Sequence, residues 1–265
     1  MDPAPGPVAN SNIDWRRPWF APWRERGEPV SRRVLSGISV HDALNQERRG
    51  SMRFVPPDAS PPGTAYEQQI FQSGECPTRD NLHDFFNGLV WLEMPRAKSR
   101  LNALQAAQIA SQGVVATRGP LRDAITLFDE NGAVLHAPEP LWQALAARDW
   151  LRLFVELRPL WAQARLLLVG HALLEKLARP RKNITAHLWN VCAPDGSIGE
   201  VDGWLAGELT AARLVAKPFL PLPLLGVPGW WPGNEDVSFY DDPRVFRPAG
   251  REESITTPPA APPAS

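Results

Sequence analysis

The chain has 265 residues, of which 43% are hydrophobic and 22% charged, proportions that are ordinary for a globular protein. Its 28 basic and 29 acidic residues give a formal net charge of −1, which supplies no overall attraction to nucleic acid or to an anionic membrane. The two cysteines lack metal-ligand spacing and fit a reducing compartment, and neither a signal peptide nor a membrane-spanning run is visible. The sequence therefore predicts a cytoplasmic protein without nucleic-acid or membrane partners, and it leaves the oligomeric state open.

Proline and tryptophan are the over-represented residues, with 29 and 11 copies. Residues 1–30 are rich in proline and carry three spaced tryptophans, Trp15, Trp19 and Trp23. This pattern predicts an irregular arm whose aromatic side chains pack on the body of the protein. Residues 249–265 contain no aromatic residue and many prolines and alanines, which predicts a disordered tail. The globular domain is then expected to occupy residues 31–248.

In the first half of the chain, helical patterns alternate with a proline-rich connection. The expected elements are a helix over residues 31–49, a loop over 54–63, a short strand over 66–71, and helices over 79–94 and 97–112. Thr78 is a suitable N-cap for the helix over 79–94, and Pro95 ends that helix.

The second half mixes strands and helices. Asn131-Gly132 suits a tight turn, so residues 124–136 are predicted to form a β-hairpin. The other expected elements are helices over 139–147, 149–163 and 201–214, a helical segment over 166–177 that begins as a helix or a strand, an ambiguous segment over 184–191, and an irregular segment over 217–248. Together they predict a mainly helical single α+β domain with a β-hairpin or small sheet and long Pro/Gly/Trp-rich irregular segments. Two domains remain an alternative, because no low-complexity linker divides the middle of the chain.

The stretch over residues 78–91 concentrates the reactive side chains of the chain. In a helix, an arc of about 100° would carry Asp80, His83, Asp84, Asn87 and Trp91, opposite an apolar face. Such a polar face can hold a metal, move a proton or bind a polar ligand. It can equally be the solvated side of an ordinary amphipathic helix.

The adjacent pair His83-Asp84 provides an imidazole and a carboxylate, a ligand set of metal-dependent phosphohydrolases that are built on helices. Those enzymes use a further His upstream and a further Asp downstream. His41-Asp42 and Asp123 stand about forty residues before and after the pair. A divalent metal (Zn, Mn or Mg) held by His83 and Asp84 is one interpretation, and a solvated helix face is the other.

Three further groups carry candidate chemistry. His171 and Glu175 are spaced i, i+4 on a predicted helix, and His187 follows. The pair either chelates a metal ion, acts as an oriented imidazole, or makes an ordinary surface contact. Arg181 and Lys182 belong to a basic run that either binds a phosphate or carboxylate or interacts with the helix dipole. Trp230-Trp231 either stacks on a ring of a ligand or covers the core.

Four separated blocks resemble one known family, and they occur in the family's order. They are Arg79 to Asn87, Arg122-Asp123-Ala124 leading to Phe128–Gly132, Gly170 to Leu177, and Leu225 to Trp231. The family is a group of uncharacterised proteobacterial proteins catalogued as domain of unknown function 3025, and the resemblance runs from about Val34 to Arg247. It implies a bacterial source and one domain over most of the chain, and it carries over no catalytic role.

The functional hypothesis therefore depends on the residues themselves. The first version is a metal-assisted hydrolase that acts on phosphoesters, with His83 and Asp84 as metal ligands or acid–base groups. Asp80 and Asn87 would orient them. His171, Glu175 or His187 would approach from the predicted helical segment over 166–177 and the residues after it. The alternative is a non-catalytic scaffold that binds a small-molecule ligand or a protein through the same polar face. Convergence of these groups in a concavity would favour the enzyme.

Overall fold

Helices form most of the chain and surround a small mixed sheet. The computed structural model describes residues 13–48, 50–59, 63, 65–112 and 119–248. The helices are α1 Arg24–Leu35, α2 Val40–Gln46, α3 Tyr66–Ser73, α4 Leu82–Glu93, α5 Pro95–Gln112, α6 Pro120–Asn131, α7 Glu139–Ala146, α8 His171–Leu177, α9 Ile198–Glu208 and α10 Ala211–Val215. The predicted tail and the first 12 residues of the predicted arm lie outside the described residues.

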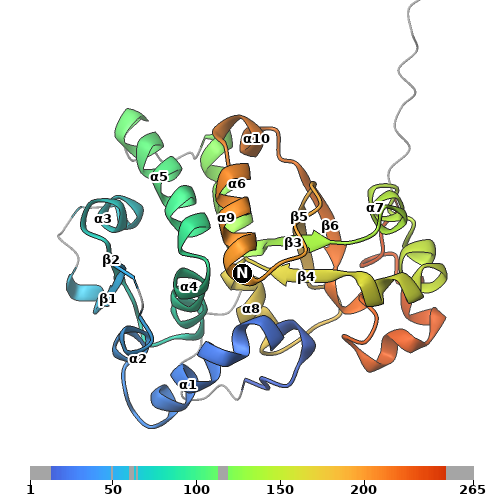
Figure 1. The fold of residues 1–265 in the computed structure, drawn as a ribbon, viewed down its shortest axis with the longest axis horizontal. Helices are drawn as coiled ribbons and strands as arrows, with labels where there is room; N and C mark the ends of the chain where they lie inside the picture. The colour runs from blue at the N-terminus through green and yellow to red at the C-terminus, as the bar shows by residue number, and fades with distance from the viewer. Residues whose placement is uncertain (1–12, 49, 60–62, 64, 113–118, 249–265) are drawn as a thin grey trace, which may run out of the picture.

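Two sheets organise the strands. The larger has the order β4-β3-β5-β6, in which β3 pairs antiparallel with β4 and parallel with β5, and β5 pairs antiparallel with β6. Its strands are β3 Gly132–His136, β4 Arg165–Leu168, β5 Thr185–Trp189 and β6 Phe219–Pro223. The smaller sheet is a parallel pair, β1 Arg53–Val55 with β2 Glu75–Pro77. In Figure 1 the small sheet and α3 lie at the left, the large sheet at the centre right, and α4, α5 and α6 between them.

One hydrophobic core joins these elements. Buried side chains from Ile13 to Phe246 belong to a single cluster, so the expectation of a mainly helical α+β domain is confirmed. Trp15, Trp19 and Trp23 are buried in this cluster as predicted, whereas Trp230 and Trp231 are only half-buried against it. None of the helices that the structure describes is long and apolar enough to cross a membrane.

The irregular arm and the first helix were predicted with wrong boundaries. Residues 18–23 form a short 3₁₀ helix and α1 begins at Arg24, within the segment expected to be irregular. The predicted helix over 31–49 is divided between α1 and α2. Gly37 lies at the break with a φ of +98°, a backbone conformation that glycine adopts readily.

Two strand predictions were also wrong. The segment over 66–71 belongs to α3, a helix that ends at the left-handed Gly74. The expected hairpin over 124–136 is instead helix α6 followed by strand β3, and β3 pairs with the distant β4. Gly132 has a φ of −73°, so Asn131-Gly132 marks a helix-to-strand junction rather than a two-residue turn.

Helix α4 is held by both its cap and its packing. Asn81, not Thr78, is the N-cap, and its side chain accepts a hydrogen bond from the Asp84 backbone N–H. Gly88 lets α2 approach α4, since a Cβ there would lie 2.3 Å from a methyl carbon of Leu44. Because the apolar residues of α4 are buried in the core, its polar face is presented to α3, α5 and α8 in a defined orientation.

The substitution Trp23→Ala should destabilise the protein by about 3–5 kcal/mol, because the indole is 0% exposed and its removal leaves a cavity. Phe71→Ala removes an aromatic ring that is 58% exposed and should change the free energy of unfolding by less than about 0.5 kcal/mol. Urea denaturation of both variants measures this difference. Equal effects would show that the N-terminal tryptophans do not belong to the core.

Candidate functional site

A pocket of about 510 Å³ opens beside the polar face of α4. Helices α3, α4, α5 and α6 and the start of α8 contribute its wall, and the volume suits a small-molecule ligand. The polar side chains that line it are Tyr66, Glu67, Arg79, His83, Asp84, Asn87, Lys98, Asn102, Gln105, Thr126, Asp129, Glu130 and His171. The pocket therefore gathers His83, Asp84, Asn87 and His171 of the predicted site, and Glu175 reaches it through its contact with His83.

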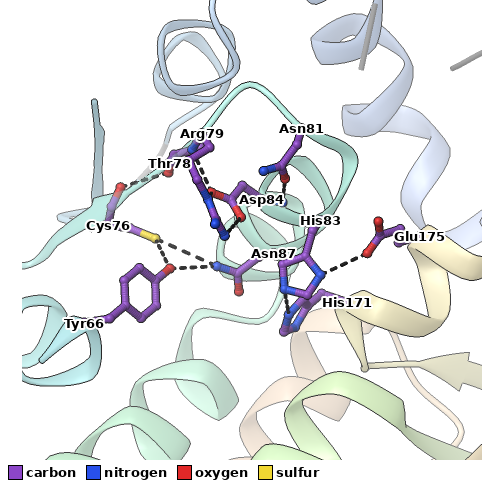
Figure 2. Close-up of polar contacts among 10 residues, drawn as sticks. All are labelled: Tyr66, Cys76, Thr78, Arg79, Asn81, His83, Asp84, Asn87, His171 and Glu175. Carbon is purple, nitrogen blue, oxygen red and sulfur yellow. Dashed lines mark hydrogen bonds and ion pairs between the residues drawn. The ribbon is translucent and has the colours of Figure 1, made fainter. Parts of the chain in front are cut away.

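Two histidines from different helices face each other at this pocket. The Nε2 atoms of His83 on α4 and His171 on α8 are 3.0 Å apart, and the Nδ1 atom of His83 is 2.9 Å from Oε2 of Glu175 (Figure 2). His171 is buried, whereas the His83 side chain keeps 31% exposure. Helix packing thus brings His83 together with two predicted residues, His171 and Glu175, that lie about ninety positions later in the chain.

The close approach of α8 depends on Gly170. A Cβ at this position would lie 2.4 Å from the backbone oxygen of Glu130, at the end of α6. The Gly170 N–H also donates to the Gly132 carbonyl at 2.8 Å. Since His171 follows directly as the first residue of α8, the missing side chain of Gly170 allows that imidazole to lie beside Asp129 of α6.

The two histidines have opposite pKa shifts. Burial lowers the pKa of His171 to about 3, against the favourable charge of Asp129, so its imidazole is neutral at physiological pH. The hydrogen bond with Glu175 raises the pKa of His83, against a smaller effect of burial. His83 is therefore the group of the pair that takes up and releases a proton near neutral pH.

The tautomers follow from the neighbouring charges. His171 Nδ1 lies 3.6 Å from Asp129 Oδ2 and has no hydrogen-bond partner. The proton of the neutral His171 ring is favoured on this nitrogen, because a lone pair there would face a carboxylate. Nε2 of His171 then accepts, and protonated His83 donates from Nε2 to His171 and from Nδ1 to Glu175. Loss of the Nε2 proton of His83 would leave two lone pairs 3.0 Å apart, which further favours the charged form of His83.

A buried lysine connects the histidines to α4 and α5. The Lys98 ammonium, with a side chain only 6% exposed, donates to Asp129 Oδ1 at 2.6 Å and to Asn87 Oδ1 at 2.9 Å. Burial opposes ionisation of Asp129, but the charge of Lys98 outweighs it and the pKa of Asp129 is lowered. Asn87 in turn donates to the Tyr66 hydroxyl at 3.0 Å, and this hydroxyl lies 3.2 Å from Cys76 Sγ (Figure 2).

Asp84 faces away from the histidines. Its carboxylate binds the Arg79 guanidinium through two hydrogen bonds of 2.9 Å and also accepts from the Arg79 backbone N–H (Figure 2). Among the described residues, no three His, Cys, Asp or Glu side chains are arranged to hold a metal ion. The predicted metal pair His83-Asp84 therefore finds no support in the geometry, because the Asp84 carboxylate is already occupied by Arg79.

The remaining predicted residues do not line this pocket. Asp80 accepts from the backbone N–H of Val40 at 2.7 Å and so stabilises the start of α2. Lys182 pairs with Asp242 and lies over the Phe239 ring, Arg181 is exposed, and His187 stacks edge-on with Phe219 of β6. Trp230 and Trp231 line a separate, more open pocket together with residues of the N-terminal arm. The acid Asp123 that was considered as a further ligand is exposed on α6.

Sequence reasoning missed five residues of the site, namely Tyr66, Cys76, Arg79, Lys98 and Asp129. One signal was available: Leu121, Ala124, Ile125 and Phe128 recur at helical spacing, which would have placed Asp129 on a helix instead of in a turn. The others could not be found, because a lone Lys or Tyr in a helical pattern does not indicate which distant side chain it meets.

Residues 52–250 match the family described as "Protein of unknown function (DUF3025)". This match covers more than half of the chain, so the chain belongs to that family, as the resemblance of the four sequence blocks implied. Comparison with curated proteins and with solved structures gives no match.

Protein stability should increase with pH between about 4.5 and 6.5. His171 titrates near 6.5 when unfolded and near 3 when folded, so in this window the unfolded chain binds the extra proton. The free energy of unfolding should rise by up to about 1.4 kcal/mol per pH unit from this group. His83 has the opposite sign: its raised pKa contributes stability that is present below pH 6.5 and lost as the pH rises through its folded value.

Urea titrations at several pH values measure both limbs of this profile. His171→Gln should flatten the rise between pH 4.5 and 6.5, and His83→Gln should flatten the fall above it. His187→Gln is the control for the first limb, because burial lowers the pKa of this half-exposed ring to a smaller extent. A slope that persists in His171→Gln would mean that another group is responsible.

Replacement of Lys98 should be costly, because it leaves the Asp129 carboxylate without its partner. Lys98→Met is expected to lower the free energy of unfolding by about 3 kcal/mol, and the double variant Lys98→Met/Asp129→Asn should recover part of this loss. Arg53→Met breaks an exposed pair with Glu75 and should cost less than about 1 kcal/mol. Additive losses in the double variant would contradict a coupled buried pair.

Proposed function

We propose that this protein is a hydrolase in which His83 is the general acid–base group. The observation that supports the proposal is the position of His83 between Glu175 and His171, on the wall of a pocket large enough for a small molecule. An imidazole whose pKa is raised from 6.5 and whose ring is partly exposed is suited to proton transfer near neutral pH. Glu175 and His171 act as positioning residues.

The contacts of His83 assign a role to each partner. In the base form, Nδ1–H remains bonded to Glu175. The Nε2 lone pair faces Nε2 of His171 at 3.0 Å, so this contact must open before Nε2 takes a proton from a water molecule in the pocket. Glu175 stabilises the imidazolium that results, and His83 then passes the proton to the leaving group. His171 stays neutral because of its burial, so it accepts from the protonated His83 ring without competing strongly for the proton.

This proposal differs from a metal-assisted phosphoesterase. Three cations lie on the pocket wall or at its edge, and each already has a carboxylate partner: Arg79 with Asp84, Lys98 with Asp129, and His83 with Glu175. The geometry therefore supports proton transfer better than the binding of a metal or a phosphate. A scaffold that only binds a ligand would use the same pocket, and the two functions are separated by the presence of turnover.

His83→Gln should reduce kcat/KM by about 10²–10⁴-fold on a hydrolysable probe, because the general base is removed. A suitable first set is p-nitrophenyl acetate, p-nitrophenyl butyrate, the corresponding anilides and p-nitrophenyl phosphate. The wild-type rate should rise with pH through the pKa of His83, and Glu175→Gln should shift this limb to lower pH, because the charge that raises the pKa is lost.

Two control substitutions lie outside the site. His187→Gln and Arg181→Ala change a histidine and a cation that do not line the pocket, and they should leave the rate unchanged. An equal rate in wild type and His83→Gln would overturn the assignment of the base. Binding of a ligand without any turnover would favour the scaffold instead.

A further inference from the structure

The orientation of the Asn87 amide is determined by Lys98. An ammonium group can only donate hydrogen bonds, so the Asn87 atom at 2.9 Å from Lys98 Nζ must be the carbonyl oxygen. The amide nitrogen of Asn87 is then the atom at 3.0 Å from the Tyr66 hydroxyl. Because this nitrogen can only donate, the Tyr66 oxygen accepts, and the phenolic proton must be directed elsewhere.

The phenolic proton of Tyr66 has only a weak partner in the structure. Apart from Asn87, the partner found for this hydroxyl among the described residues is Cys76 Sγ at 3.2 Å, and a thiol sulfur is a poor acceptor. Burial of the hydroxyl end raises the pKa of Tyr66 well above its ordinary value, so the group remains a neutral donor. Tyr66 lines the pocket, and a better acceptor on a ligand would displace the sulfur.

The charges of the wall decide which acceptor fits. The cations Arg79, Lys98 and His83 are paired with carboxylates, and the wall carries Glu67 and Glu130 in addition. An anionic phosphate would meet more negative than positive charge there. An uncharged carbonyl oxygen avoids this repulsion and accepts the hydrogen bond that Tyr66 offers.

Tyr66 and His83 lie on either side of Asn87. His83 and Asn87 are one turn apart on α4, where side chains four residues apart are separated by roughly 5–6 Å at Cβ. Figure 2 shows the Tyr66 hydroxyl on one side of the Asn87 amide and the His83 ring on the other. The donor Tyr66 and the base His83 therefore flank the same amide of the pocket wall.

We propose that Tyr66 binds the carbonyl oxygen of the substrate, and that the substrate is an uncharged ester or amide. This inference rests on the proposed function. The oxygen of water attacks the carbonyl carbon and gives a proton to His83, and the carbonyl π electrons move to the oxygen that Tyr66 holds. The C–O or C–N bond of the tetrahedral intermediate then breaks. The leaving alcohol or amine takes the proton from His83, and the acid is released. Tyr66 stabilises the oxyanion as a fixed donor.

The binding of one neutral and one anionic probe molecule tests this assignment separately from turnover. The probes are N-benzylacetamide and benzylphosphonate, which share the benzyl group and differ in the polar end, and ligand-observed NMR gives their Kd values. Wild type should bind the amide more tightly than the phosphonate. Tyr66→Phe should raise the Kd of the amide by about tenfold, the effect of one lost hydrogen bond. It should leave the weak binding of the phosphonate unchanged.

Tyr240→Phe is the matched control, because its hydroxyl shares its proton between the carbonyls of Gly226 and Asn234 and the residue does not line the pocket. It should leave both Kd values unchanged. Tyr66→Phe should also reduce kcat more than it changes KM on any ester that wild type hydrolyses. Its thermal midpoint should fall only slightly, because the ring stays in place and the Asn87 amide loses one acceptor.

Three results would overturn the inference: tighter binding of the phosphonate, equal amide binding in wild type and Tyr66→Phe, or no amide binding at millimolar concentration. Failure of the proposed function has a different signature. In that case amide binding would depend on Tyr66 while no hydrolysis occurred, and His83→Gln would bind the amide as wild type does.

Discussion

The buried Lys98 ammonium is the interaction on which the rest of the pocket depends. It lies on α5 and contacts Asn87 of α4 and Asp129 of α6, so one side chain holds three helices in register. Its charge keeps Asp129 ionised and adds to the effects that keep His171 neutral. Its inability to accept a hydrogen bond orients the Asn87 amide and, through it, the Tyr66 hydroxyl. A neutral residue of similar size would remove the ion pair with Asp129 and the donor that orients Asn87.

The histidine pair shows how the same environment gives two imidazoles different roles. His171 is buried beside an ion pair and loses its proton, whereas His83 is partly exposed beside a carboxylate and keeps its own. The contact between them requires α8 to start against the end of α6, which Gly170 permits. The acid–base role that we propose for His83 therefore depends on backbone packing as much as on the ionisable groups.

Local patterns predicted the parts of the fold that local forces decide. The apolar spacing of α4, the helix α7 and the burial of the N-terminal tryptophans follow from periodicity and from the cost of exposing large aromatic rings. The errors at α3 and α6 arose where a short segment satisfied two patterns. Tyr66–Phe71 was too short to distinguish a strand from a helix, and the turn preference of Asn131-Gly132 was overridden by pairing of β3 with β4.

For the candidate site, the sequence by itself determined that His83, Asp84 and Asn87 share one face of a helix, and that His171 and Glu175 lie on another. Helical geometry relates residues three or four positions apart, and it is the same wherever the helix lies. Only the tertiary structure decided that His83 meets His171 and Glu175 while Asp84 turns to Arg79. It also decided that Lys98, Asp129 and Tyr66 complete the pocket. Those contacts join residues far apart in the chain, and their geometry is set by how the helices pack in one core, which no local pattern encodes.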